Sequence, residues 1–302
     1  RSDRDWSSDV CSSDLEEEEG FRVTYLPVDC CGRVKLDALK EALCPETILV
    51  SIMYVNNEVG TVQPVEEAAS IVKDYNPSIL FHSDAVQGFG KYRIYPKRQK
   101  IDLLSVSGHK IHGPKGIGFI YINEKAKVKP IIFGGEQQKN MRSGTENVPG
   151  IVGDVVAAER AARTMAERTA KEIEVRDYLI NRILTEIPNC RLNGDPVKRL
   201  PNNCNISFEF IEGESLLIML DMKGICASSG SACTSGSLDP SHVLLAIGLK
   251  HEEAHGSLRL TLSEDSTKEE MDIVAEEVKK IVQRLRDMSP LYEDFLKSQK
   301  NN

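Results

Sequence analysis

The stretch IDLLSVSGHKIHGPKGIGFIYI (residues 101–122) places two short apolar runs on either side of a polar turn that contains Lys110. The same alternation of apolar runs and polar-faced segments occurs upstream in ILVSIMYV (48–55), VEEAASIVKDY (65–75) and ILFHSDA (79–85). Short apolar runs of this kind are typical of strands buried on both faces, as in a parallel α/β sheet. The sequence therefore predicts an α/β fold with a mostly parallel sheet.

After this region the pattern changes and predicts a smaller α+β domain. Residues 151–187 are rich in alanine, glutamate and arginine and contain no proline, which predicts one or two connecting helices. Strands are expected at 203–210 and 257–262, and helices at 214–223 and from a capping box formed by Thr267 and Glu270 through to Met288.

Residues 1–15, RSDRDWSSDVCSSDL, differ from everything that follows. They are polar, rich in serine and aspartate, and show neither a helical nor a strand period. We interpret them as unrelated, artefactual sequence and exclude them from the fold. A partial large domain is then expected at 16–164 and a small C-terminal domain at 165–302.

Composition predicts a cytoplasmic protein with reduced thiols. Hydrophobic residues make up 40% of the 302 residues, which is enough to bury a core. Lysine and arginine total 38 against 46 acidic residues, and a chain of net charge −8 without a basic stripe is a poor ligand for nucleic acid. No apolar run is long enough to cross a membrane, and the eight cysteines lack the spacing of a disulfide framework or a metal site. We expect no metal, no nucleic-acid partner and no membrane partner.

Polar side chains follow the apolar runs at the ends where open α/β sheets bind their ligands. They are Asn56 and Asn57 after the first run, Asp84 and Gln87 after the second, and Ser107, His109 and Lys110 after the third. Pyridoxal phosphate (PLP) needs a lysine amine and a carboxylate that faces its ring nitrogen, and Lys110 and Asp84 match those two requirements. Ser107 and His109 can donate to its phosphate. The GHK triplet alone would favour a solvated loop lysine, and only the whole set of strand-end residues favours a cofactor site.

A second candidate site is Cys233 in the loop SSGSACTSGS (228–237). A cysteine among glycine, serine and threonine is accessible and able to swing toward a ligand, whereas Cys226 follows Ile225 and is interpreted as a structural cysteine. Arg259 lies in an apolar alternating run, where a guanidinium either meets a carboxylate or belongs to a surface strand.

These residues stand in motifs that resemble the cysteine desulfurases of the NifS and IscS group, within the class V aminotransferases of fold type I. The motifs are VNNEVGTVQP (55–64), SDAVQGFGK (83–91), SGHKIHGPKGIG (107–118), MRSGTENV (141–148) and SSGSACTSGSLDPSHVL (228–244). The resemblance extends from Glu16 to the C-terminus. It implies a PLP enzyme that converts L-cysteine to L-alanine and leaves a persulfide for iron–sulfur cluster assembly or other sulfur transfer.

The resemblance also implies a role for each matched residue. Lys110 would carry the cofactor and remove the substrate α-proton, and Asp84 would pair with the ring nitrogen. Gln87 and Asn57 would bond the phenolic oxygen and the substrate, and His82, Ser107 and His109 would line the ring and phosphate. Thr145 would reach the phosphate of a neighbouring subunit, which implies a homodimer. Arg259 would bind the cysteine carboxylate, and Cys233 would attack its sulfur and pass it to an acceptor such as an iron–sulfur scaffold.

Two alternatives remain open. One is a related PLP enzyme, such as a selenocysteine lyase or an aminotransferase. The other is a catalytically incomplete chain that only docks scaffold proteins. The resemblance starts near Glu16, whereas the family has a substantial segment before that point, so we expect a truncated chain with weak activity.

Overall fold

A computed structural model describes residues 20–229 and 240–300 of the chain. The chain divides into two compact units. The parallel-sheet unit comprises residues 39–55 and 63–167. The antiparallel-sheet unit comprises residues 20–38, 56–62 and the described residues from Arg168 onward.

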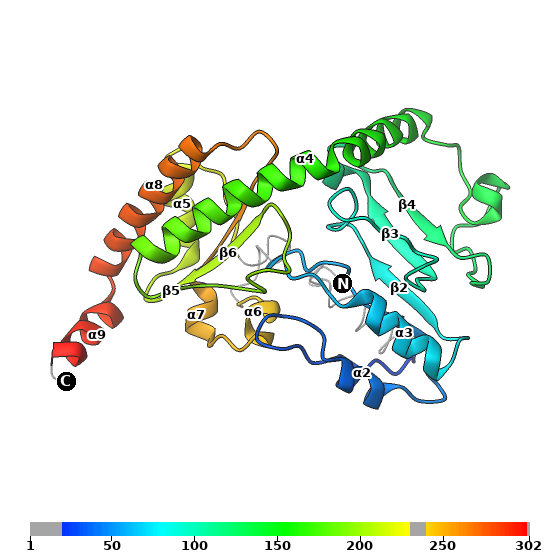
Figure 1. The fold of residues 1–302 in the computed structure, drawn as a ribbon, viewed down its shortest axis with the longest axis horizontal. Helices are drawn as coiled ribbons and strands as arrows, with labels where there is room; N and C mark the ends of the chain where they lie inside the picture. The colour runs from blue at the N-terminus through cyan, green and yellow to red at the C-terminus, as the bar shows by residue number, and fades with distance from the viewer. Residues whose placement is uncertain (1–19, 230–239, 301–302) are drawn as a thin grey trace. The chain divides into compact units, whose positions relative to one another are not determined.

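The parallel-sheet unit contains a four-stranded sheet in the order β1-β2-β3-β4 (Figure 1). Its strands are β1 (Leu49–Ser51), β2 (Leu80–Asp84), β3 (Leu103–Ser107) and β4 (Gly118–Ile122). The first three run parallel, and β4 pairs antiparallel with β3. The prediction of a mostly parallel α/β sheet is confirmed. The turn between β3 and β4 contains only the short 3₁₀ helix η1 (Gly108–Ile111), which is too short to serve as the crossover that a parallel pair requires.

Helix α3 (Val65–Tyr75) links β1 to β2 and buries Val65, Ala68, Ala69 and Val72 along one face. Phe81 and Ile101 are fully buried in the same unit. Asp102 lies just before β3, where its carboxylate accepts the Phe81 backbone N–H at 2.8 Å and forms an ion pair with Lys73. This buried acid therefore ties α3 and β2 to the start of β3. Helix α2 (Leu36–Ala42) precedes β1.

The antiparallel-sheet unit contains the three-stranded sheet β5-β6-β7 and most of the helices. Its elements are β5 (Cys190–Leu192), β6 (Asn203–Phe208), α5 (Gly213–Asp221), α6 (His242–Ala246), α7 (His251–His255), β7 (Ser257–Thr261), α8 (Lys268–Asp287) and α9 (Pro290–Lys300). Helix α4 (Val148–Glu186) is one continuous helix that starts in the parallel-sheet unit and continues into this one. The predicted capping box at the start of α8 is confirmed, because Thr267 accepts from the Glu270 backbone and Glu270 accepts from that of Thr267.

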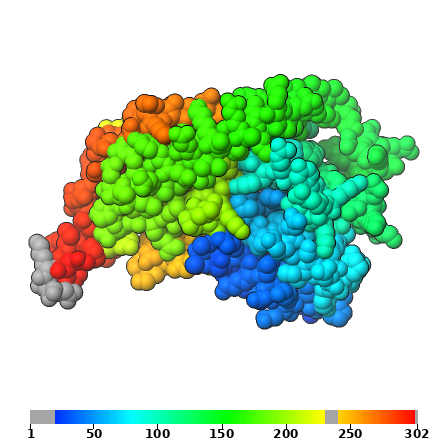
Figure 2. Space-filling view, in the orientation of Figure 1, coloured from blue at the N-terminus to red at the C-terminus, as the bar shows by residue number. Residues whose placement is uncertain are grey.

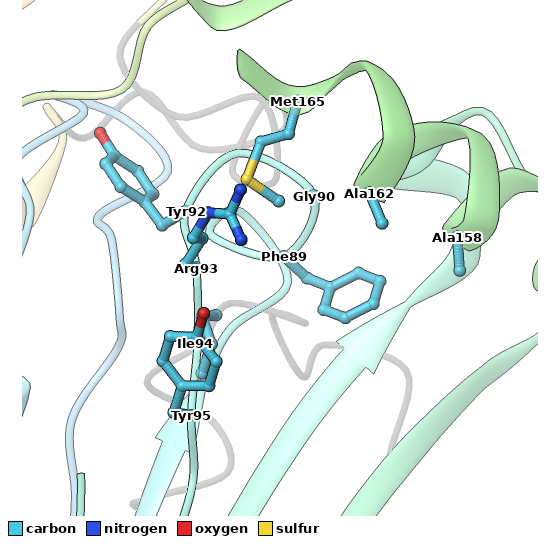
Figure 3. Close-up of a pocket in the computed structure, with 9 residues that line it drawn as sticks. All are labelled: Phe89, Gly90, Tyr92, Arg93, Ile94, Tyr95, Ala158, Ala162 and Met165. Carbon is cyan, nitrogen blue, oxygen red and sulfur yellow. The ribbon is translucent and has the colours of Figure 1, made fainter. Parts of the chain in front are cut away.

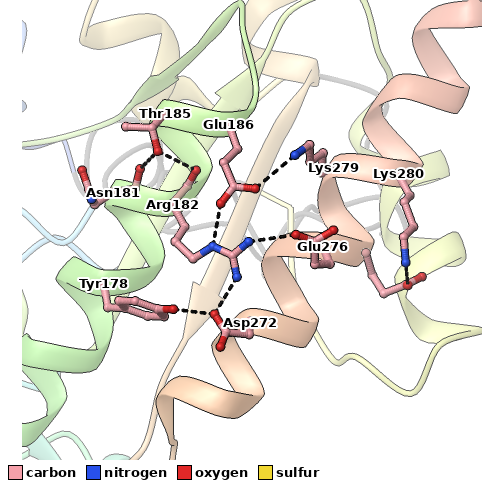
Figure 4. Close-up of polar contacts among 10 residues, drawn as sticks. Tyr178, Asn181, Arg182, Thr185, Glu186, Asp272, Glu276, Lys279 and Lys280 are labelled. Atoms are coloured by element: carbon pink, nitrogen blue, oxygen red, sulfur yellow. Dashed lines mark hydrogen bonds and ion pairs between the residues drawn. The ribbon is translucent and has the colours of Figure 1, made fainter.

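Helices α4 and α8 are joined by an ion-pair network around Arg182 (Figure 4). The Arg182 guanidinium bonds Glu186 at 2.6 Å on its own helix and reaches Asp272 and Glu276 on α8. Lys279 adds a second contact to Glu186 at 3.2 Å, and these two cations lower the pKa of Glu186 to about 2. The network holds the two helices over the core formed by Leu179, Ile183, Phe208, Leu216 and Val278.

Candidate active site

The carboxyl ends of β2 and β3 present polar side chains at one edge of the parallel sheet. Asp84 is the last residue of β2 and pairs with Ser105, and Ser107 is the last residue of β3. In both strands these polar residues alternate with buried ones, so His82, Asp84, Ser105 and Ser107 share a sheet face. The structure therefore brings three of the predicted residues, His82, Asp84 and Ser107, to one edge.

Lys110 follows directly in η1, on a turn that closes on itself. The Gly108 backbone N–H donates to the Ile117 carbonyl at 3.0 Å, and the Gly113 N–H donates to the Gly108 carbonyl at 2.9 Å. Lys110 and His109 are both exposed, and the Ser107 hydroxyl hydrogen-bonds His109 Nδ1 at 2.7 Å. The turn thus presents the lysine amine and holds the Ser107 and His109 side chains next to each other.

Asp154 lies beneath this turn, and the sequence interpretation did not identify it. Its carboxylate is buried, and Oδ1 has no hydrogen-bond partner among the described residues. A Cβ atom on Gly108 would stand 2.4 Å from that oxygen, so any other residue two positions before the lysine would displace the Asp154 carboxylate. One feature of the sequence could have identified Asp154: it is an acid within the otherwise apolar stretch 150–157. This stretch lies in the first turns of α4, where Gly153 packs closely against Pro114.

His82 is fixed by hydrogen bonds at both ring nitrogens. Ser51 on β1 bonds Nδ1 at 2.8 Å, and Ser105 on β3 bonds Nε2 at 2.9 Å, so the imidazole joins three strands. Burial lowers the pKa of His82, and the nearby Asp84 carboxylate opposes that shift without cancelling it. The ring is therefore a neutral, oriented group beside Asp84. Neither serine was predicted, because a serine within a strand has no distinctive sequence pattern.

Asp84 retains one carboxylate oxygen for a ligand. Oδ1 accepts the Val86 backbone N–H at 2.8 Å, and Oδ2 makes no hydrogen bond to the described residues. The chain then turns through Ala85–Phe89, where Gln87 is half-buried and Gly88 packs against the Tyr54 ring. An open carboxylate oxygen, an exposed amine, a hydroxyl and an imidazole at adjacent strand ends match the donors and acceptors that PLP requires.

Arg259 and Asn57 belong to the antiparallel-sheet unit and contact each other there. Arg259 Nη1 donates to the Asn57 carbonyl at 3.1 Å, while its Nε is buried and has no partner in the described part of the chain. Arg259 is half-buried, and a guanidinium with an unpaired buried nitrogen is a binding group for an anion.

The remaining predicted residues have different outcomes. Thr145 is exposed between η2 (Gln137–Asn140) and α4. Cys233 lies outside the described residues. The interpretation of Cys226 as a buried structural cysteine was wrong, because its side chain is exposed after the turn that ends α5.

A small pocket in the parallel-sheet unit is separate from these residues (Figure 3). It has a volume of about 180 Å³, and its lining residues are Phe89, Gly90, Tyr92, Arg93, Ile94, Tyr95, Ala158, Ala162 and Met165. Sites for drug-sized ligands usually have at least about 300 Å³. Its apolar lining also lacks the amine and carboxylate that PLP needs, so we assign no cofactor to it.

The comparisons with known proteins, together with the α/β sheet, identify a PLP-dependent enzyme of fold type I. The chain belongs to the aminotransferase class V family, whose model matches residues 3–274. It is 52% identical over 284 residues to the protein of Clostridium botulinum named cysteine desulfurase IscS. The aligned residues cover 93% of this chain and 71% of that relative.

Solved structures agree with the sequence relatives. A structure titled NifS-like protein matches with a TM-score of 0.83 and 36% identity, over 92% of this chain and 73% of that one. A structure titled SspA in complex with cysteine matches with a TM-score of 0.70 and 35% identity, over 85% of this chain and 71% of that one. The fold class and the family expected from the motifs are thereby confirmed.

Proposed function

We propose that this chain is a cysteine desulfurase, which uses PLP to convert L-cysteine to L-alanine while its sulfur passes to Cys233. The observation that carries the proposal is the set of polar groups at the ends of β2 and β3, in a chain half identical to a cysteine desulfurase. When bound, PLP supplies an electron sink for the substrate α-carbon. No metal is needed for this chemistry.

The chain's own residues have distinct tasks in this proposal. Lys110 would hold the cofactor and take the substrate α-proton, and Asp84 would pair with the ring nitrogen. Ser107 and His109 would bind the phosphate, and His82 would line the ring. Gln87 and Asn57 would bond the phenolic oxygen and the substrate.

Arg259 and Cys233 act on the substrate itself. Arg259 would bind the cysteine carboxylate through its guanidinium, whose Nε has no partner among the described residues. The Cys233 thiolate attacks the substrate sulfur, so a new S–S bond forms as the substrate C–S bond breaks. The products are alanine and a persulfide on Cys233. The outer sulfur of this persulfide then passes to an acceptor such as an iron–sulfur scaffold.

A homodimer would complete the phosphate site through Thr145 of a second copy. Large apolar side chains of the segment that precedes Thr145 in the sequence are exposed in the parallel-sheet unit, including Ile131 at 88% and Phe133 at 80%. On α4, Val148, Val152, Val155 and Val156 are exposed at helical spacing. The part of the chain that contains these valines is coloured green in Figure 2. Apolar area of this kind marks an interface, and it supports a dimer through this face.

The cytoplasmic location stays a prediction from composition. Within residues 20–229 and 240–300, no helix is both long and apolar enough to span a bilayer.

The test is product analysis with the purified chain, PLP and L-cysteine. We expect alanine and sulfide in equal amounts with a thiol reductant and no added 2-oxo acid. Lys110→Ala should form neither product, and Lys115→Ala, in the same turn, should keep activity. A requirement for a 2-oxo acid would identify an aminotransferase, and a marked preference for selenocysteine would identify a selenocysteine lyase. Absence of both cofactor binding and turnover would favour the alternative of a catalytically incomplete chain that only docks scaffold proteins.

A further inference from the structure

Two adjacent cysteines, Cys30 and Cys31, stand at the tip of a tight hairpin in the antiparallel-sheet unit, where the proposed reaction assigns them no task. Val28 and Val34 pair across the hairpin. The Asp29 N–H donates to the Arg33 carbonyl at 2.9 Å, and Asp29 Oδ1 accepts the backbone N–H groups of Cys31 at 2.8 Å and Arg33 at 2.9 Å. The tip is therefore a defined turn with both cysteines inside it.

Further contacts anchor this turn on its own unit. The Thr61 hydroxyl donates to the Cys31 carbonyl at 2.5 Å, and Arg33 forms an ion pair with Asp195. Gly32 completes the turn at φ +76°, a conformation that other residues rarely adopt. A ligand that joins the two thiols would thus meet a pre-ordered backbone, which lowers the entropy cost of binding.

The two cysteines are neighbours in this turn, and neither is fully buried. Cys30 is exposed and Cys31 is half-buried. Desolvation, with Cys30 as the next contributor, raises the pKa of Cys31. Other described cysteines differ: burial raises the pKa of Cys204 to about 12, and the Cys190 thiol donates to the Ile187 carbonyl at 3.0 Å. Cys30 and Cys31 thus combine adjacency in an ordered turn with access.

The chemistry of the pair selects its ligand. Structural zinc needs four ligands, and the described residues hold no group of three or more histidine, cysteine or acidic side chains placed for a metal. Two adjacent thiols on one ordered turn instead suit a thiophilic centre that forms two covalent bonds to sulfur.

We propose that Cys30 and Cys31 form a vicinal dithiol site that binds trivalent arsenicals. With an arylarsenoxide, two As–S bonds form, the As=O bond is lost, and its oxygen leaves as water with the two thiol protons. Arsenic stays trivalent, so the step needs neither an oxidant nor a reductant. The ring that closes includes both sulfurs, which makes the adduct resistant to monothiols and reversible by a dithiol.

The test uses the full chain carrying Cys226→Ser and Cys233→Ser, which removes the exposed Cys226 and the cysteine of the 228–237 loop. The probe is one equivalent of phenylarsine oxide. Intact mass should rise by one arsenical less one water, two thiols should disappear from titration, and the arsenic should map to the peptide that contains residues 29–33. Excess 2-mercaptoethanol should leave the adduct in place, and 2,3-dimercaptopropanol should remove it.

Single variants then test whether both thiols are needed. Cys30→Ser and Cys31→Ser should each abolish the adduct that resists 2-mercaptoethanol, while Cys44→Ser should retain it as the matched control. Peptide mapping of the parent protein locates the arsenic even if a variant folds poorly. Arsenic on other cysteines, or an unchanged resistant adduct in Cys30→Ser, would overturn the proposal.

Discussion

Ser228 and Arg259 exchange both of their backbone hydrogen bonds: the Ser228 N–H donates to the Arg259 carbonyl at 3.0 Å, and the Arg259 N–H donates to the Ser228 carbonyl at 2.7 Å. Cys233 comes five residues after Ser228 in the sequence. This bridge therefore ties the start of the loop that carries the proposed sulfur acceptor to the residue that we propose binds the substrate carboxylate. These two hydrogen bonds use only backbone atoms, so a substitution at Arg259 can keep them. The effect of the substitution can then be assigned to the loss of the side chain.

The Arg259 side chain should determine the affinity for cysteine. Losing a hydrogen bond to a charged group costs about 2 kcal/mol, or about a 30-fold rise in KM, so we expect that increase for Arg259→Ala with the PLP absorbance retained. Arg259→Lys should recover only part of the affinity, because an ammonium lacks the planar fork of the guanidinium. Steady-state kinetics with cysteine measure both variants. A normal KM in Arg259→Ala would show that the Arg259 side chain does not bind the substrate and would leave it the structural contact to the Asn57 carbonyl.

Lys110 should be the residue that carries PLP. It is exposed on the turn after β3, close in sequence to Ser107 and His109, which are hydrogen-bonded to each other. Borohydride reduction followed by peptide mapping should place the cofactor on residue 110, and Lys110→Ala should lose the covalent link. Lys115→Ala, in the same turn, is the control and should keep the label. Cofactor found on Lys115 or Lys91 would show that the assignment is wrong.

Cys233 should be separable from cofactor binding. A serine hydroxyl is a much weaker nucleophile toward sulfur than a thiolate, so Cys233→Ser should retain the PLP spectrum and lose persulfide formation. Alkylation of the persulfide after one turnover, followed by mass spectrometry, measures the difference. Cys226→Ser is the matched control, because Cys226 is an exposed cysteine seven residues earlier in the sequence. Unchanged persulfide in Cys233→Ser would move the acceptor to another thiol.

The sequence predicted the strand-end residues because each interrupts an apolar run, and apolar runs follow from the burial of whole strands. It could not predict the partners that orient those residues. Ser51 and Ser105 bond His82 from two other strands, a relation set by the register between strands. Asp154 reaches Gly108 only because α4 starts against the lysine turn. The antiparallel direction of β4 likewise follows from the length of the turn before it, since the periodicity of a strand does not reveal its direction.

His82 gives a pH-dependent prediction. Its pKa is lowered from 6.5 by burial, so the unfolded chain takes up a proton near that pH more readily than the folded chain. Its contribution to stability is therefore present above about pH 6.5 and is lost as the pH falls toward the folded-state pKa. Glutamine offers both an amide donor and a carbonyl acceptor for Ser51 and Ser105, and it does not titrate.

We therefore expect the melting temperature of the wild-type chain to fall more than that of His82→Gln between pH 7.5 and 5.5. His251→Gln is the control, because it removes an exposed histidine on α7. Calorimetry of the three proteins at both pH values measures the difference, and Ser105→Ala, which removes one of the two bonds to the ring, should lower the melting temperature already at pH 7.5. An equal fall in melting temperature for wild type and His82→Gln would contradict the prediction. It would mean that His82 takes up its proton as easily in the folded chain as in the unfolded one. The hydrogen bonds from Ser51 and Ser105 would then have no part in keeping the ring neutral beside Asp84.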